Sequence, residues 1–232
     1  MKSFKKRFIY IVCIITALCV SILSFVGCAG GKSDAYDVIK TTKKNNFTYL
    51  NENAEKGQVV LIGDSIIEIF PTEMLQIDGK IVYNRGISGD FSNRMCERLD
   101  DNALNIAPSS IFILVGTNDL NLARDAQEIV GYINMAVSKC KESGVEKIVV
   151  SSLLPVKKSI NSGMVGIRKN SDIVSINESI KQMCEVQGVV YADTYSSVVD
   201  ENGEFNEAYT YDGLHPNAQG YAKICEVIAP LM

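Results

Sequence analysis

The stretch "DAQEIVGYINMAVSKCKESGVEKIVV", residues 125–150, combines two periodicities that together decide the fold. Its first part repeats apolar residues at the spacing of one helix face: Ile129, Ile133, Ala136, Val137 and Cys140. Gly144 is a natural helix stop, and the short apolar run that follows at once has the length of a buried strand. A helix that leads directly into a strand predicts parallel strands joined by helical crossovers.

The same alternation runs through the rest of the chain. Four other short apolar runs are bounded by turn-forming residues: "QVVLIG" (58–63), "KIVYNRG" (80–86), "SSIFILVG" (109–116) and "GVVYAD" (188–193). Helical spacing returns at 171–188 and at 217–232, where Pro216 stands at a position suited to a helix start. The pattern predicts an α/β fold, a three-layer α/β/α sandwich around a mostly parallel sheet of about five strands.

The N-terminal segment is typical of an exported protein. Residues 1–7 carry four basic side chains, residues 8–27 are uncharged and apolar, and small residues surround Cys28. We therefore expect a signal peptide at 1–27. The sequence "FVGC" (25–28) resembles the lipobox of bacterial lipoproteins, in which this cysteine is lipidated. An uncleaved anchor is the alternative, since the run is long enough to cross a bilayer. Both predict an extracytoplasmic, membrane-anchored protein.

The remaining chain has the size of one domain. Residues 28–56 are polar and are predicted to form the lipidated N-terminus, a tether and an early helix, whereas 57–232 form the folded domain. The formal net charge is −4 although the leader is basic, which disfavours nucleic acid as a partner. With one histidine and no C-x-x-C, the sequence predicts neither a metal site nor a cofactor, and the remaining cysteines are expected as buried thiols.

Polar clusters stand at the ends of the predicted strands. They are "GDS" (63–65), "NRGISGD" (84–90) and "GTND" (116–119), and a fourth cluster, "DGLH" (212–215), precedes the last predicted helix. Ligands of parallel α/β sheets bind at the carboxyl ends of the strands, so all four clusters are expected to meet at one edge.

Their chemistry is that of nucleophilic catalysis. A serine hydroxyl needs a base, and His215, the only imidazole in the chain, can act on Ser65. Asp212 lies three residues before His215 and can orient its ring. The oxyanion formed by attack needs fixed donors, for which the Asn118 amide and the backbone N–H groups of Gly89 and Ser65 are candidates.

In this order, "GDSI", "GISGD", "GTND" and "DGLHPNAQGY" resemble the four sequence blocks of the SGNH hydrolases, also called the GDSL esterase and lipase family. The resemblance extends from about residue 59 to the C-terminus and implies a flavodoxin-like sandwich. It also implies Ser65 as nucleophile, His215 as base, Asp212 as the third triad member, and Ser65, Gly89 and Asn118 as oxyanion donors. Ile66 stands where the family name has leucine, which leaves the nucleophile intact.

These observations predict a serine esterase that removes short acyl groups, with O-acetyl groups on a carbohydrate as the preferred substrate. The same residues would serve a lysophospholipase, a lipase or an O-acyltransferase. A non-catalytic glycan-binding surface lipoprotein is a further alternative, against which the absence of tryptophan speaks.

Other polar residues near the motifs have expected roles outside the chemistry. Asp64, Thr117 and Asp119 are expected to shape the loops, and Arg85 and Arg94 to be solvated charges. Residues 156–170 are polar and contain glycine, so they are predicted to form a mobile wall of the pocket. The basic residues of this wall favour a polar or anionic substrate: Lys157, Lys158, Arg168 and Lys169.

Overall fold

The computed structural model describes residues 31–232, so the predicted signal peptide and the lipidation site at Cys28 lie outside the described residues. The chain divides into two units, with the boundary between residues 43 and 44. Helix α2 (Gly31–Asn51) crosses the boundary and occupies most of the predicted tether. Between residues 31 and 232, no helix has the length and apolar character needed to cross a membrane.

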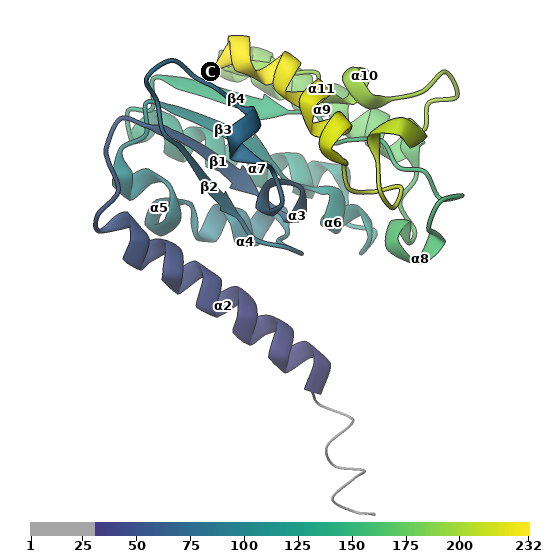
Figure 1. Ribbon diagram of the computed structural model, residues 1–232, viewed down its shortest axis with the longest axis horizontal. Helices are drawn as coiled ribbons and strands as arrows, with labels where there is room; N and C mark the ends of the chain where they lie inside the picture. Colours follow the sequence, from purple (N-terminus) through teal and green to yellow (C-terminus); the bar gives the residue numbers. More distant parts are fainter. Residues whose placement is uncertain (1–30) are drawn as a thin grey trace, which may run out of the picture. The chain divides into compact units, whose positions relative to one another are not determined.

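The second unit is built on a five-stranded, all-parallel sheet in the order β2-β1-β3-β4-β5 (Figure 1). The strands are β1 (Val59–Gly63), β2 (Val82–Gly86), β3 (Ser110–Leu114), β4 (Lys147–Ser151) and β5 (Val190–Ala192). All five predicted strands are therefore confirmed, and their order is that of a flavodoxin-like sheet. The register pairs Gly63 with both Gly86 and Leu114, so the three strands next to one another end level.

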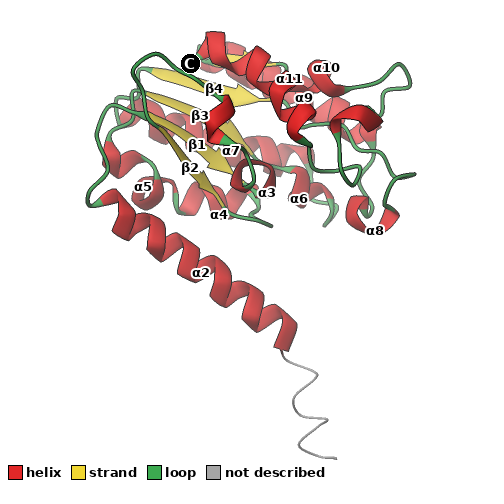
Figure 2. Ribbon diagram, in the orientation of Figure 1, coloured by secondary structure: helices red, strands yellow, loops and turns green. Residues whose placement is uncertain are grey.

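Helices cover both faces of the sheet, which confirms the three-layer sandwich (Figure 2). Alternate residues of β1 pack into different cores: Val60 and Ile62 lie in the cluster that contains α7 and α9, whereas Val59 and Leu61 lie in the cluster that contains α11. The long helices are α7 (Ala126–Glu142), α9 (Asn170–Gln187) and α11 (Ala218–Ile228). The short ones are α3 (Ser65–Glu68), α4 (Ser92–Glu97), α5 (Leu99–Asn102), α6 (Thr117–Leu120), α8 (Ser162–Val165) and α10 (Thr194–Val198).

Helix α7 has the boundaries and the buried face that its sequence predicts. The Asp125 side chain caps its first turn by accepting from the Gln127 N–H, and the five predicted apolar residues are buried. The start of α11 differs from the prediction, because Asn217 caps the helix and Pro216 precedes the cap. The four cysteines of the described part are free and buried, as expected: Cys96, Cys140, Cys184 and Cys225.

Candidate active site

The turn between β1 and α3 presents Ser65 at the edge where the strands end. Asp64 caps α3, its Oδ1 accepting from the Ile66 N–H at 3.0 Å, so the helix begins at the serine itself. The end of β2 lies directly against this turn. A Cβ atom added at Gly86 would lie 2.1 Å from the Glu68 nitrogen, so only glycine permits the approach. Gly86 is the last residue of β2.

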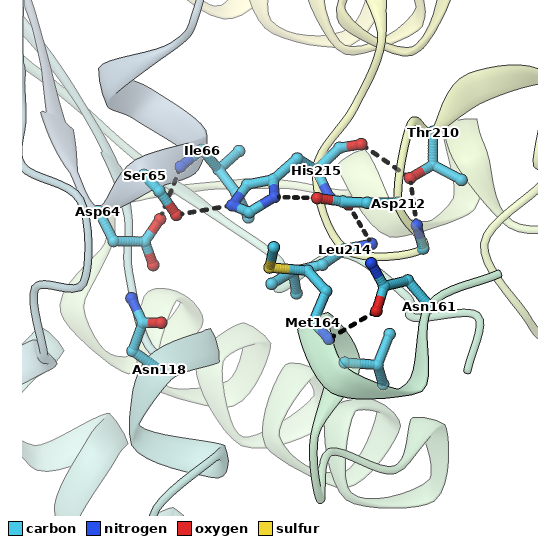
Figure 3. A network of polar contacts seen from close by, with 12 residues as sticks. Asp64, Ser65, Ile66, Asn118, Asn161, Met164, Thr210, Asp212, Leu214 and His215 are labelled. Carbon is cyan, nitrogen blue, oxygen red and sulfur yellow. Dashed lines mark hydrogen bonds and ion pairs between the residues drawn. The ribbon is translucent and has the colours of Figure 1, made fainter. Parts of the chain in front are cut away.

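Three predicted side chains meet in one hydrogen-bonded line (Figure 3). Ser65 Oγ lies 3.0 Å from Nε2 of His215, although 150 residues separate them in the sequence. The other ring nitrogen, Nδ1, lies 2.8 Å from Oδ2 of Asp212. The structure therefore brings together the hydroxyl, the imidazole and the carboxylate that the sequence predicts.

The hydrogen-bond pattern fixes which ring nitrogen of His215 carries the proton. Burial would raise the pKa of Asp212, but hydrogen bonds from the His215 backbone, the His215 ring and the Leu214 backbone hold it below its usual value. An ionised carboxylate can only accept, so Nδ1–H donates to Asp212 and Nε2 is left as an acceptor. The Ser65 hydroxyl then donates to Nε2, which is the arrangement needed for proton abstraction.

The loop that carries His215 is held by hydrogen bonds between its own side chains and its own backbone. Asp212 Oδ1 accepts from the N–H groups of His215 (2.8 Å) and Leu214 (3.0 Å). Thr210 Oγ1 donates to the His215 carbonyl at 2.7 Å and accepts from the Gly213 N–H at 3.0 Å. Thr210 was not among the predicted site residues, although threonine hydroxyls commonly bond to backbone groups a few residues away.

Asn118 lies beside Asp64 and Ser65, with its amide nitrogen turned toward them (Figure 3). It belongs to the first turn of α6, directly after β3. Its Nδ2 donates to the Asp90 carbonyl at 3.0 Å, which ties it to the loop of Gly89. Gly89 has a φ of +70°, a left-handed conformation that favours glycine. The structure thus places the predicted donors Asn118 and Gly89 on neighbouring loops.

A buried arginine, Arg98, holds the Gly89 loop against the sheet. Its guanidinium donates to Asp90 Oδ2 (2.6 Å), to the Arg85 carbonyl (2.8 Å) and to the Gly63 carbonyl (2.9 Å), and its side chain is 3 % exposed. It therefore joins the ends of β1 and β2 to the residue that follows Gly89. Sequence analysis missed Arg98, because a charged residue in a short helical segment normally faces solvent.

The three loop-shaping residues are buried, as their expected role requires. Asp119 accepts from the backbone and hydroxyl of Ser92 and from Arg124, which joins α6 to α4. The Thr117 carbonyl accepts from Arg168. Asp64 Oδ2 has no hydrogen-bond partner among the described residues, and burial raises the pKa of this carboxyl to about 7.

The prediction that Arg85 is a solvated charge is wrong. It is buried in β2 and donates to Asn51 Oδ1 and to the Asn102 carbonyl, so it serves the packing of α2 and α5. Arg94, in contrast, is exposed and lies over the ring of Phe91.

The segment 156–170 contains the short helix α8 and several polar contacts. Asn161 caps α8 through the Met164 N–H (3.0 Å), and Figure 3 shows both residues on the side of Asp212 and Leu214. Lys157 lies among the carboxylates of Asp200, Glu204 and Glu207, at 3.2–3.4 Å. Arg168 is buried. The prediction that the basic residues of this wall face an anionic substrate is therefore wrong for Lys157 and Arg168.

Comparison with known proteins agrees with this geometry. Residues 61–223 match the sequence model of the "GDSL-like Lipase/Acylhydrolase family". The chain is 27% identical over 197 residues to platelet-activating factor acetylhydrolase IB subunit alpha2 of Bos taurus, covering 82% of each chain. A solved structure from Streptococcus pneumonia superposes with a TM-score of 0.79 at 25% identity, covering 92% of this chain and 98% of that one. A GDSL-like lipase from Bacteroides thetaiotaomicron superposes with a TM-score of 0.71 at 25% identity, covering 81% and 95%.

Proposed function

Since the chain belongs to the GDSL-like lipase/acylhydrolase family and is a hydrolase, we propose that it cleaves carboxylic esters through an acyl-enzyme on Ser65. The observation that carries this proposal is the continuous line from Ser65 Oγ to His215 (3.0 Å) and on to Asp212 (2.8 Å). A binding protein has no need for a serine whose hydroxyl donates to a base held in one tautomer, so the glycan-binding alternative is disfavoured.

In the first half-reaction, His215 Nε2 takes the proton of Ser65 as Oγ attacks the ester carbonyl. Asp212 accepts from Nδ1–H and stabilises the imidazolium that forms. The same imidazolium then gives its proton to the leaving alcohol, which departs and leaves the acyl group on Ser65.

The negative charge that develops on the carbonyl oxygen requires donors fixed in advance. The Asn118 amide and the backbone N–H groups of Ser65 and Gly89 supply them in this proposal. The contacts of Asn118 with Asp90 and of Asp90 with Arg98 support it, because they hold two of the donor loops before substrate arrives.

In the second half-reaction, water gives a proton to His215 as it attacks the acyl carbonyl. The imidazolium then returns that proton to Ser65 Oγ as the bond from the acyl carbon to Oγ breaks, which restores the free serine and the neutral base and releases the acid. An alcohol in place of water would give acyl transfer with the same residues. Both outcomes remain within the proposal, and product analysis with a sugar acceptor distinguishes them.

The acyl group is proposed to be short, as in an acetyl ester. Several relatives are platelet-activating factor acetylhydrolase subunits, which supports acetyl as the acyl part. O-acetyl carbohydrate is our preferred alcohol part. A lysophospholipid or other lipid ester is the second candidate, because Met164 and Tyr211, neighbours of the triad, are 42% and 71% exposed and offer apolar surface. A chain-length series of p-nitrophenyl esters, with acetylated xylan and lysophosphatidylcholine, separates the two.

The nucleophile is tested by Ser65→Ala. We expect loss of p-nitrophenyl acetate hydrolysis and of labelling by a fluorophosphonate probe, with unchanged thermal unfolding. Ser171→Ala, an exposed serine on α9, is the matched control and should keep both activities. Hydrolysis retained by a folded Ser65→Ala protein would exclude the mechanism.

We also propose that the protein is an extracytoplasmic lipoprotein anchored through Cys28. The basic start, the apolar run and the "FVGC" sequence support this. Replacing Cys28 by serine should abolish incorporation of radioactive fatty acid and release the protein from the membrane fraction. Membrane association of the unchanged protein without any label would favour the uncleaved anchor.

A further inference from the structure

Arg168 is a buried guanidinium whose hydrogen bonds converge on α6 and α8. It is 5% exposed, so it cannot serve as a solvent-facing binding residue. Nε donates to the Thr117 carbonyl at 2.6 Å, and Nη2 donates to Oδ1 of Asn118 at 3.2 Å. Nη1 donates to the carbonyls of Met164 (3.1 Å) and Val165 (2.9 Å). The side chain therefore joins the helix that carries Asn118 to the wall segment beside the triad.

The contact with Asn118 controls which end of the amide faces the site. A side-chain amide presents a donor at Nδ2 and an acceptor at Oδ1, and a half-turn of the terminal torsion exchanges the two. An arginine has only donors, so only Oδ1 can face Arg168. A backbone carbonyl has only acceptors, so only Nδ2 can face Asp90, as it does at 3.0 Å. The two contacts thus specify the same orientation.

This orientation matters because a reversed amide would place an oxygen where the oxyanion develops. Nδ2 carries two hydrogens, of which Asp90 takes one, so the second can point to the substrate oxygen. A reversed Asn118 would instead repel the developing charge. The Asp90 contact alone opposes reversal through one hydrogen bond, and the Arg168 contact adds a second one that holds Oδ1.

We propose that Arg168 is a positioning residue that holds the Asn118 amide with its N–H groups toward the oxyanion; this inference rests on the proposed function. Its hydrogen bonds go to Thr117, Asn118, Met164 and Val165 and not to Ser65 or His215, so it acts on the reaction through Asn118. Its contacts with Met164 and Val165 also couple the position of the wall to that amide.

Arg168→Met keeps much of the side-chain volume and removes all four of these hydrogen bonds. We expect kcat for p-nitrophenyl acetate to fall by about 10²-fold, approaching the loss from Asn118→Ala, because removal of one oxyanion donor typically costs ~10²–10³-fold. The KM should change little, since the interaction serves the transition state. Arg168→Lys, which cannot reproduce the forked geometry, should lie between the variant and the unchanged protein. Lys181→Met, an exposed residue of α9, is the control and should keep kcat.

A double-mutant cycle distinguishes positioning from general structural support. If Arg168 acts through Asn118, adding Arg168→Met to Asn118→Ala should lower kcat no further than about twofold. Equal losses in both backgrounds would overturn the inference, and so would an unchanged kcat in a folded Arg168→Met protein. If Arg168→Met does not fold, the same cycle is run with Arg168→Lys, and additivity there is equally decisive. Failure of the proposed function itself is a separate result, because it shows as hydrolysis that survives Ser65→Ala.

Discussion

Asp64 positions the turn that carries the nucleophile and at the same time destabilises the folded state. Its Oδ1 caps the turn of Ser65, while its buried Oδ2 has no partner among the described residues. Motif order alone predicts the positions of Ser65 and His215, but it cannot predict a partner such as Arg168, whose contacts come from segments 50 and 51 residues away. The burial of Arg168 depends on tertiary packing, which a local sequence pattern cannot predict.

The raised pKa of Asp64 gives a pH dependence of stability with a definite sign. An unfolded aspartate titrates near ~3.9, so between that pH and about 7 the folded protein holds a proton that the unfolded chain has lost. The free energy of unfolding therefore falls as pH rises through this range. Asp64→Asn cannot ionise and should gain stability relative to the unchanged protein, by at most roughly 4 kcal/mol, between pH 4 and 8.

Urea unfolding at several pH values measures this difference. Asp125→Asn is the matched control, because Asp125 caps α7 in the same way but is exposed to solvent. A difference between Asp64→Asn and the unchanged protein that stays constant from pH 4 to 8 would contradict the prediction.

Helices and strands with a clear repeat of apolar residues can be predicted from the sequence, whereas elements without such a repeat cannot. The five strands and α7, α9 and α11 are long or uniformly apolar enough to be recognised. Helices α4, α5, α8 and α10 have four to six residues each and carry no period that a sequence can reveal. Strand β2 continues through Asn84, whose amide donates to the Ile67 carbonyl at 2.6 Å, so a tertiary contact outweighs the turn preference of asparagine.

The two faces of α7 provide a prediction at this scale. Ile133 is 1% exposed in the core below the sheet, whereas Met135 on the same helix is 52% exposed. Ile133→Ala should lower the free energy of unfolding by about 3 kcal/mol, because it removes buried methylenes and leaves a cavity. Met135→Ala should change it by less than ~0.5 kcal/mol in the same urea titration. Equal losses would mean that the helix is not amphipathic in the way described.

At the scale of the whole molecule, the C-terminal segment completes the site begun by β1. Helix α11 packs against the sheet, and its Tyr221 hydroxyl donates to the Ile66 carbonyl at 2.7 Å across 155 residues of sequence. The all-parallel topology explains the convergence, because strands that end level collect their following loops at one edge. The sequence predicted this meeting of motifs but not the tyrosine that secures it.

Tyr221→Phe tests that link. It removes the hydroxyl and leaves the Ile66 carbonyl without this donor, so we expect a loss of about 1 kcal/mol in the free energy of unfolding. We also expect a severalfold lower kcat, since Ile66 directly follows the nucleophile. Tyr49→Phe, 67% exposed, is the control and should change neither. A Tyr221→Phe protein with unchanged stability would show that packing alone fixes α11.

Ser65 and His215 are separated by 150 positions, so the ribosome makes the nucleophile well before its base. The serine is made 150 positions before the histidine, so the growing polypeptide holds a serine without its base over that interval. Because the chain has a single histidine, a message interrupted before codon 215 yields a product with no base to substitute. Hydrolytic competence through this pair therefore cannot arise before residue 215 has been added to the chain.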